Sequence, residues 1–174
     1  MQALKNSGKV QHVGIAVRGN EAARAAIESN FFETIQVAYS ILDQRMAPDI
    51  LESAQKNNVG VINRSVLLKG VLTRNYSSLP DSLAPLKEAA TKADAIAQEL
   101  GTVLPALGLQ FVLSNSAIST ALVGTMKIEH LAAAQKATTK TPLPDEVLAK
   151  LKDLAISDPD LIDPAKWPPP TQTV

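Results

Sequence analysis

The chain has 174 residues, of which 45 % are hydrophobic, and its 17 basic and 17 acidic side chains give a formal net charge of zero. This length is enough for one domain with a sizeable core and too short for two ordinary ones. The balanced charge argues against a nucleic acid or an anionic membrane as the partner. Because cysteine is absent and there are only two histidines, disulfides and thiolate metal sites are excluded and no metal site is expected.

Membrane-spanning and secretory segments are not expected either. No apolar run approaches the roughly 18 residues that cross a membrane. The first residues, Met1 to Lys9, contain no apolar stretch of the kind found in secretory signals. These features predict a cytoplasmic protein.

The hydrophobic pattern repeats a unit of apolar strand, polar turn and amphipathic helix four times along the chain. Asn20 suits the N-cap of the first helix, and Gly101 suits the end of the long alanine-rich one. Strands are expected at residues 10–17, 34–39, 59–63 and 119–123. Helices are expected at residues 20–27, 48–57, 83–100, 104–113, 128–137 and 146–155. This alternation predicts an α/β fold with a parallel sheet, and periodicity alone fits a barrel and a flavodoxin-like fold equally well.

The segment from Val61 to Thr73 has the pattern of a strand that delivers a loop to a ligand. A β-branched apolar start runs into the polar corner Asn63-Arg64-Ser65, and a short apolar loop with Gly70 follows. Parallel strands present such loops at their carboxyl ends. The segment resembles the Ala-Arg-Ser-Pro-Leu-Ala-Gly-Gly-Leu-Leu-Thr stretch of aldo-keto reductases, where it follows the seventh strand of the barrel.

Three further segments resemble the same family in the same order. Residues 8–15 are similar to the fifth strand, Gly-Lys-Ile-Arg-Tyr-Ile-Gly-Val, and residues 36–43 to the sixth, Gln-Val-Pro-Tyr-Asn-Leu-Leu-Asp. Residues 113–125 resemble the eighth strand and its approach. The resemblance implies half of a (β/α)8 TIM barrel, strands five to eight with their helices, over residues 1–156. Residues 157–174 are then a proline-rich carboxyl-terminal tail, expected to be extended or partly disordered.

The resemblance also implies a site for NADP(H) or NAD(H). Gln36 would hold the nicotinamide carboxamide, although Ala16-Val17 stand where the family has a Ser-Asn pair, and Arg64 would lie beside the nicotinamide. The simpler alternatives are that Gln36 is a strand residue bonded to neighbouring backbone and that Arg64 lies in a solvated loop. The remaining expected contacts are Ser65, Leu67 and Gly70 at the pyrophosphate and Gly124, Thr125 and Lys127 at the adenosine end.

The other candidate residues have simpler explanations. Tyr39 is expected in the core or a pocket wall. Asp43 with Glu52, or Glu129 with Asp145, could be imagined as acid–base pairs, but each is more simply a solvated charge. Trp167 is either an exposed aromatic or an anchor that packs the tail onto the body.

No catalytic residue is assigned, because the Asp, Tyr, Lys and His of the family reside on the first four strands. The first hypothesis is the cofactor-binding half of an oxidoreductase that reduces aldehydes and ketones or oxidises sugars and alcohols, truncated and inactive without a separate amino-terminal half. The second is a non-catalytic half-barrel that binds a nucleotide or phosphate. The third is a structural remnant that assembles with a second copy of itself.

Overall fold

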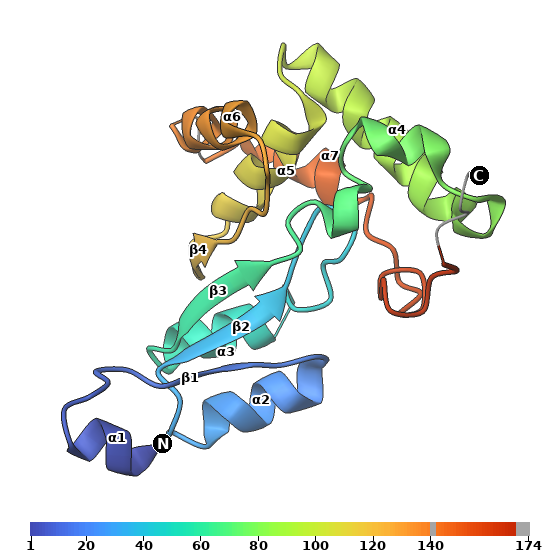
Figure 1. Ribbon diagram of the computed structural model, residues 1–174. Helices are drawn as coiled ribbons and strands as arrows, with labels where there is room; N and C mark the ends of the chain where they lie inside the picture. The colour runs from blue at the N-terminus through green and yellow to red at the C-terminus, as the bar shows by residue number, and fades with distance from the viewer. Residues whose placement is uncertain (140–141, 170–174) are drawn as a thin grey trace.

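The computed structural model describes residues 1–139 and 142–169, and its centre is a parallel four-stranded sheet (Figure 1). The spatial order β1-β2-β3-β4 follows the chain order, so each helical connection leads to the neighbouring strand. The strands are β1 Gly14–Ala16, β2 Thr34–Ala38, β3 Gly60–Arg64 and β4 Ile118–Ala121. The predicted parallel α/β fold is therefore confirmed.

The helices of the described ranges agree with the expected ones to within a few residues, apart from α1, which was not predicted. They are α1 Gln2–Asn6, α2 Asn20–Glu28, α3 Ile50–Lys56, α4 Ala84–Glu99, α5 Leu104–Leu113, α6 Ile128–Thr138 and α7 Asp145–Lys152. Three short 3₁₀ helices, Leu68–Gly70, Arg74–Ser78 and Asp81–Leu83, connect β3 to α4.

Several element boundaries were wrong by two or more residues; for example, α7 ends at Lys152 and not at residue 155. The first strand begins at Gly14 and not at residue 10, because Gly14 pairs with Thr34, where β2 itself begins. Just before it, the Val13 N–H donates to the Glu33 carboxylate at 2.7 Å, so a side chain takes the place of a ladder partner. The second crossover helix begins at Ile50, and Pro48 lies in the turn before it.

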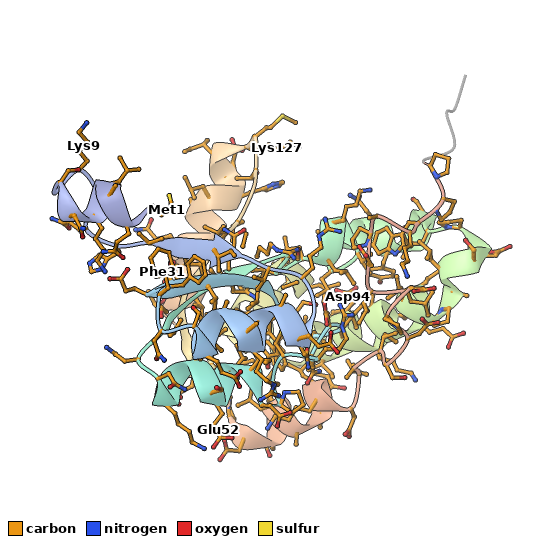
Figure 2. All side chains as sticks on the ribbon, turned by 90° about the horizontal axis from the view of Figure 1, so that it is seen from below. Met1, Lys9, Phe31, Glu52, Asp94 and Lys127 are labelled. Atoms are coloured by element: carbon orange, nitrogen blue, oxygen red, sulfur yellow. The ribbon has the colours of Figure 1, made fainter. Side chains whose placement is uncertain are left out.

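The two faces of the sheet differ. Along β2 and β3 burial alternates, so that Ile35, Val37 and Val61 are fully buried beneath α2 and α3, which lie together on one side of the sheet (Figure 2). Gln36 and Ile62, which pair across the two strands, are only half-buried on the opposite side. We call this second side the open face. The period of two places the residues between the core positions on it.

The described part of the tail is folded against the body, which corrects the expectation of an extended segment. Over residues 157–169 the chain forms turns, with Ile162 2 % exposed in the core. Trp167 packs against the core, and the Lys69 Nζ lies over its ring at 5.8 Å from the centroid, so Trp167 is an anchor. Its Nε1–H donates to the Leu161 carbonyl oxygen within the tail at 2.7 Å. The apolar side chains decide this, because burying each one stabilises the packed form by about 1.5–3 kcal/mol. The rest of the predicted tail, residues 170–174, lies outside the described residues.

Among the described residues, no single helix combines the length and apolar composition needed to cross a membrane. Taken together, Asp81–Glu99 and Leu104–Leu113 meet those two criteria, but they are bent by 90° against each other.

Replacing Gly14 with alanine is expected to destabilise the edge of the sheet. A Cβ at Gly14 would lie 2.0 Å from Thr34 Oγ1 and 3.0 Å from the Thr34 carbonyl oxygen. Because this overlap must be relieved, we expect Gly14→Ala to lower the free energy of unfolding, measured by urea denaturation, by about 1–3 kcal/mol. Adding Thr34→Ala removes the nearer atom and should restore part of the loss. Wild-type stability of Gly14→Ala would contradict the close packing of β1 on β2.

Candidate functional site

A cavity of about 570 Å³ lies at the carboxyl ends of the first three strands. We call it the strand-end cavity. Val17 follows β1, Ala38 ends β2, and Arg64 ends β3 with Ser65 directly after it, so parallel pairing brings three strand ends to one place. The tail forms another wall through Pro159, Ile162, Asp163 and Lys166.

Arg64 is a half-buried cation of this cavity without an ion-pair partner among the described residues. Its guanidinium donates to the Val17 carbonyl oxygen at 3.3 Å and to Ser65 Oγ at 3.4 Å, and no carboxylate of the described residues lies within ion-pair distance. Burial lowers the pKa of Arg64 from its ordinary value, and the positive charge of Arg18 lowers it further. Asp43 does not compensate it directly, because Arg45 engages both Asp43 oxygens at 2.8 and 2.9 Å.

A second cavity, of about 770 Å³, lies between the loop after β3, the start of α5 and the loop before α6. We call it the loop–helix cleft. Its walls are largely apolar, with Leu104, Leu109 and Ala134 among them. Its polar groups include Arg74, Asn75, Thr125 and His130. An apolar cleft with a few polar groups at its rim is the usual form of a small-molecule site.

The loop from Ser65 to Gly70 separates the two cavities. Ser65, Leu68 and Lys69 line the strand-end cavity, whereas Val66 and Leu67 line the loop–helix cleft. The backbone N–H groups of residues 65–67 donate no hydrogen bond to an acceptor within the described residues. Three successive unpaired donors on a loop are a suitable cradle for an oxyanion such as phosphate.

This loop is held in an unusual backbone conformation. Ser65, Leu68, Lys69 and Gly70 all have positive φ angles, of 62°, 42°, 53° and 93°. Such conformations cost non-glycine residues free energy and persist only where the surroundings impose them. Here the surroundings are the buried core, since Val66 and Leu68 are 2 % and 1 % exposed.

Two contacts fix the position of the loop relative to the sheet and α5. At the end of β3, the buried Asn63 donates through Nδ2 to the Tyr39 carbonyl oxygen at 2.9 Å and so ties together the ends of β3 and β2. On α5, a Cβ at Gly108 would lie 3.4 Å from Leu67 Cδ2. The absence of a side chain at Gly108 therefore lets the helix approach the loop closely.

The corner between β4 and α6 forms the outer rim of the loop–helix cleft. Thr125 Oγ1 accepts a hydrogen bond from the Lys127 N–H at 3.1 Å and lies 3.2 Å from His130 Nδ1. Gly124 and Thr125 line the cleft, but Lys127 does not. Figure 2 shows Lys127 at the outer end of α6, away from the sheet.

Five of the eight expected contact residues line one of the two cavities, and three line neither. The strand-end cavity takes Arg64 and Ser65, and the loop–helix cleft takes Leu67, Gly124 and Thr125. Three residues line neither cavity: Gln36, Gly70 and Lys127. Gln36 nevertheless lies on the open face, and its carboxamide makes no hydrogen bond to a described residue, in contrast to the alternative that it bonds neighbouring backbone.

Several lining residues were not expected from the sequence. Arg74 and Asn75 come directly after the predicted loop, so their position beyond Thr73 was a usable signal. Arg18 follows the first strand in the same way. The contribution of the tail had no such signal, because it depends on how residues 159–166 fold back.

The imagined acid–base pairs are not assembled. Asp43 is bound by Arg45, and Glu52 forms an ion pair with Lys56 at 2.6 Å on the outer side of α3 (Figure 2). Glu129 and Asp145 are exposed in the first turns of two different helices. Glu52, Glu129 and Asp145 fit the simpler explanation of a solvated charge, whereas Asp43 is 3 % exposed, so that expectation was wrong for Asp43.

The tyrosines are also accounted for. Tyr39 is 3 % exposed and stacks on Phe111 with ring centroids 5.4 Å apart, as a core residue does. Burial raises its pKa. Tyr76 donates to Asp94 at 3.0 Å, and this hydrogen bond raises the pKa of Tyr76. No group of three or more metal-ligating side chains occurs among the described residues.

The chain is similar to proteins of one known family. The model of the aldo/keto reductase family matches residues 1–156. D-threo-aldose 1-dehydrogenase of a Pseudomonas species is 26 % identical over 135 residues, covering 71 % of this chain and 40 % of that protein. L-galactose dehydrogenase of Arabidopsis thaliana is 28 % identical over 137 residues, covering 75 % of this chain and 43 % of that protein.

Solved structures show the same fold. An aldo-keto reductase from Bacillus halodurans, in its holo form, superposes with a TM-score of 0.76 at 24 % identity, covering 90 % of this chain and 54 % of that one. Glycerol dehydrogenase from Gluconobacter oxydans superposes with a TM-score of 0.72 at 21 % identity, covering 88 % and 51 %.

The chain therefore spans less than half the length of the two curated relatives and about half of the two solved structures. Its four parallel strands, joined by three helical crossovers, agree with that partial match. The family match over residues 1–156, more than half of the chain, shows that this protein belongs to the aldo/keto reductase family.

Proposed function

We propose that this chain is the carboxyl-terminal, cofactor-binding half of an NAD(P)H-dependent oxidoreductase. In this proposal residues 1–156 form strands five to eight of the barrel with their helices, and residues 157–174 form the tail. The observation that carries the proposal is the loop of residues 65–70, which separates the two cavities. The N–H groups of residues 65–67 on this loop donate no hydrogen bond within the described residues.

A dinucleotide fits this arrangement because it has three chemically different parts. The flat faces of its adenine ring suit the loop–helix cleft between Leu104 and Ala134, where Thr125 and His130 offer hydrogen bonds to its polar groups. Its pyrophosphate suits the N–H groups of residues 65–67 and the freedom of Gly70. Its carboxamide needs both a donor and an acceptor, which the unpaired side chain of Gln36 supplies.

The chemistry of a reductase needs more than these residues. A bound nicotinamide supplies the hydride, but a carbonyl that receives it also needs a proton donor near the strand ends. The chain has two tyrosines and two histidines, and none of the four lines the strand-end cavity. A separate amino-terminal half would complete both the barrel and the acid, and this chain alone is inactive in the proposal.

The relatives indicate the class of substrate for a completed barrel. Those named above are dehydrogenases of a threo-aldose and of galactose, and a third, from Microbacterium luteolum, acts on pyridoxal. We extend these to sugars and aldehydes, together with the corresponding alcohols, as the substrates of the assembled enzyme.

A second candidate follows from the two edges of the sheet. β1 and β4 each have one neighbour, and the open face between them carries Ile62 half-exposed. Two copies, each joining its β1 to the β4 of the other, would close eight parallel strands with twofold symmetry. This favours self-assembly of the chain when no amino-terminal half is present.

The chain alone is expected to bind NADPH without reducing aldehydes. In a titration that follows cofactor fluorescence, Arg74→Ala should weaken binding about tenfold, because a cation at the cleft then no longer meets the anionic cofactor. Lys127→Ala should weaken it only about twofold, since an exposed charge outside the cleft contributes little. Arg24→Gln, on the outer side of α2, is the control. Equal effects of all three variants, or no saturation by NADPH, would reject the proposed site.

In isolation the chain is expected to sediment at twice the mass of one copy. Ile62→Lys places a charge on the open face and should shift this species towards the monomer, whereas Ala95→Lys, on the exposed side of α4, should not. A wild-type monomer at all concentrations would contradict self-assembly through the open face.

A further inference from the structure

We infer that the strand-end cavity is an oxyanion site, so that the substrate of the completed enzyme carries a carboxylate or a phosphate group. This inference rests on the proposed function and names the class of its substrate. Arg18, Arg64 and Lys69 are the groups that would hold the oxyanion.

Cationic side chains outnumber carboxylates within the cavity. Five cationic side chains line it, Arg18, Arg45, Arg64, Lys69 and Lys166, against two carboxylates, Asp43 and Asp163. Arg45 and Asp43 neutralise each other through two short hydrogen bonds, and Lys166 is paired with Asp160 outside the cavity. Only Asp163 is left to face the remaining cations.

Arg18, Arg64 and Lys69 have few or weak interactions with the described residues. Arg18 Nη1 lies 3.7 Å from Asp163 Oδ1, and its side chain is 73 % exposed, so it is free to turn towards a ligand. Arg64 is half-buried with two long hydrogen bonds to neutral oxygens. Lys69 Nζ lies over the Trp167 ring, 5.8 Å from its centroid. A half-buried cation without an anion is unfavourable, and an oxyanion that accepts from both arginines removes this cost.

The cations of this site differ from the groups expected at the cofactor pyrophosphate, which are the N–H groups of residues 65–67. Arg18 follows β1 and Lys69 lies at the far end of the loop, so both face the strand ends. The unpaired N–H groups of Val66 and Leu67 belong to residues that line the loop–helix cleft, whereas Ser65, the third residue of the cradle, lines the strand-end cavity. Arg18 and Lys69 are not among the expected cofactor contacts, so the cavity keeps two cations even when Arg64 and Ser65 contact the cofactor. The sugars and the pyridoxal named by the relatives do not require such a group.

Trp167 makes the site measurable, because it is the only tryptophan of the chain and lies beside Lys69. Titration of the intact chain with inorganic phosphate, and separately with succinate, should change Trp167 fluorescence with saturation in the millimolar range. Arg18→Gln should weaken both about tenfold, and Arg18→Lys should recover part of the loss. The control, Arg24→Gln, removes an arginine whose Asp49 pair lies outside the cavity, and should change neither affinity.

Repeating the titration with NADPH present at saturation distinguishes the two sources of an oxyanion. Unchanged affinity for phosphate supports a separate substrate site, and competition assigns the cavity to the cofactor pyrophosphate and overturns the inference. Binding of NADPH without saturation by phosphate or succinate also overturns it, and leaves the proposed function standing. Saturation by either oxyanion without binding of NADPH instead rejects the proposed function and leaves an oxyanion site.

Discussion

The parallel ladder between β2 and β3 is the constraint on which the rest of the molecule depends. It pairs five residues of each strand, from Thr34 with Gly60 to Ala38 with Arg64. Because the strands are parallel, their carboxyl ends stop together, and everything that follows them is delivered to the same edge. Arg64, Ser65 and Ala38 meet at one cavity for this reason. The buried amide of Asn63, bonded to the Tyr39 carbonyl, fixes the same edge from the helical side.

The second constraint is that the sheet is covered on one face only. The covered face is apolar and closely packed, as Ile35, Val37 and Val61 show. The open face carries Gln36, Ile62 and Arg64, a mixture of polar and apolar groups that is typical of a ligand-binding barrel interior and not of a solvated surface. An exposed face with two free edges invites further strands. This is the physical basis for the proposal that the chain is one half of a closed barrel, completed by a different chain or by a second copy.

Local patterns in the sequence predict much of the fold. Helix α5 has the bounds that its apolar run and Pro105 indicate, and α4 ends just before Gly101, whose φ of 61° a glycine adopts most readily. The strand ends were predictable because parallel pairing follows from the alternation of elements. The loop of residues 65–70 was predictable from its resemblance to a family, and its distance from Gln36 along the chain agrees with their places on neighbouring strands.

What local patterns could not predict depends on contacts between distant segments. The tail lines a cavity because Ile162 and Trp167 pack against the body, which no periodicity reveals. Lys127 lies outside the cleft, whereas Arg74 lies inside it, although both are single cations in polar turns. The division of Ser65 and Leu67 between two cavities depends on how buried Val66 and Leu68 orient the loop. If the loop of residues 65–70 binds the cofactor pyrophosphate, amide hydrogen exchange with and without NADPH will detect it. Exchange should slow at residues 65–70 and at residues 123–130, and stay unchanged in α2. Unchanged exchange at residues 65–70 while NADPH is bound would contradict the account.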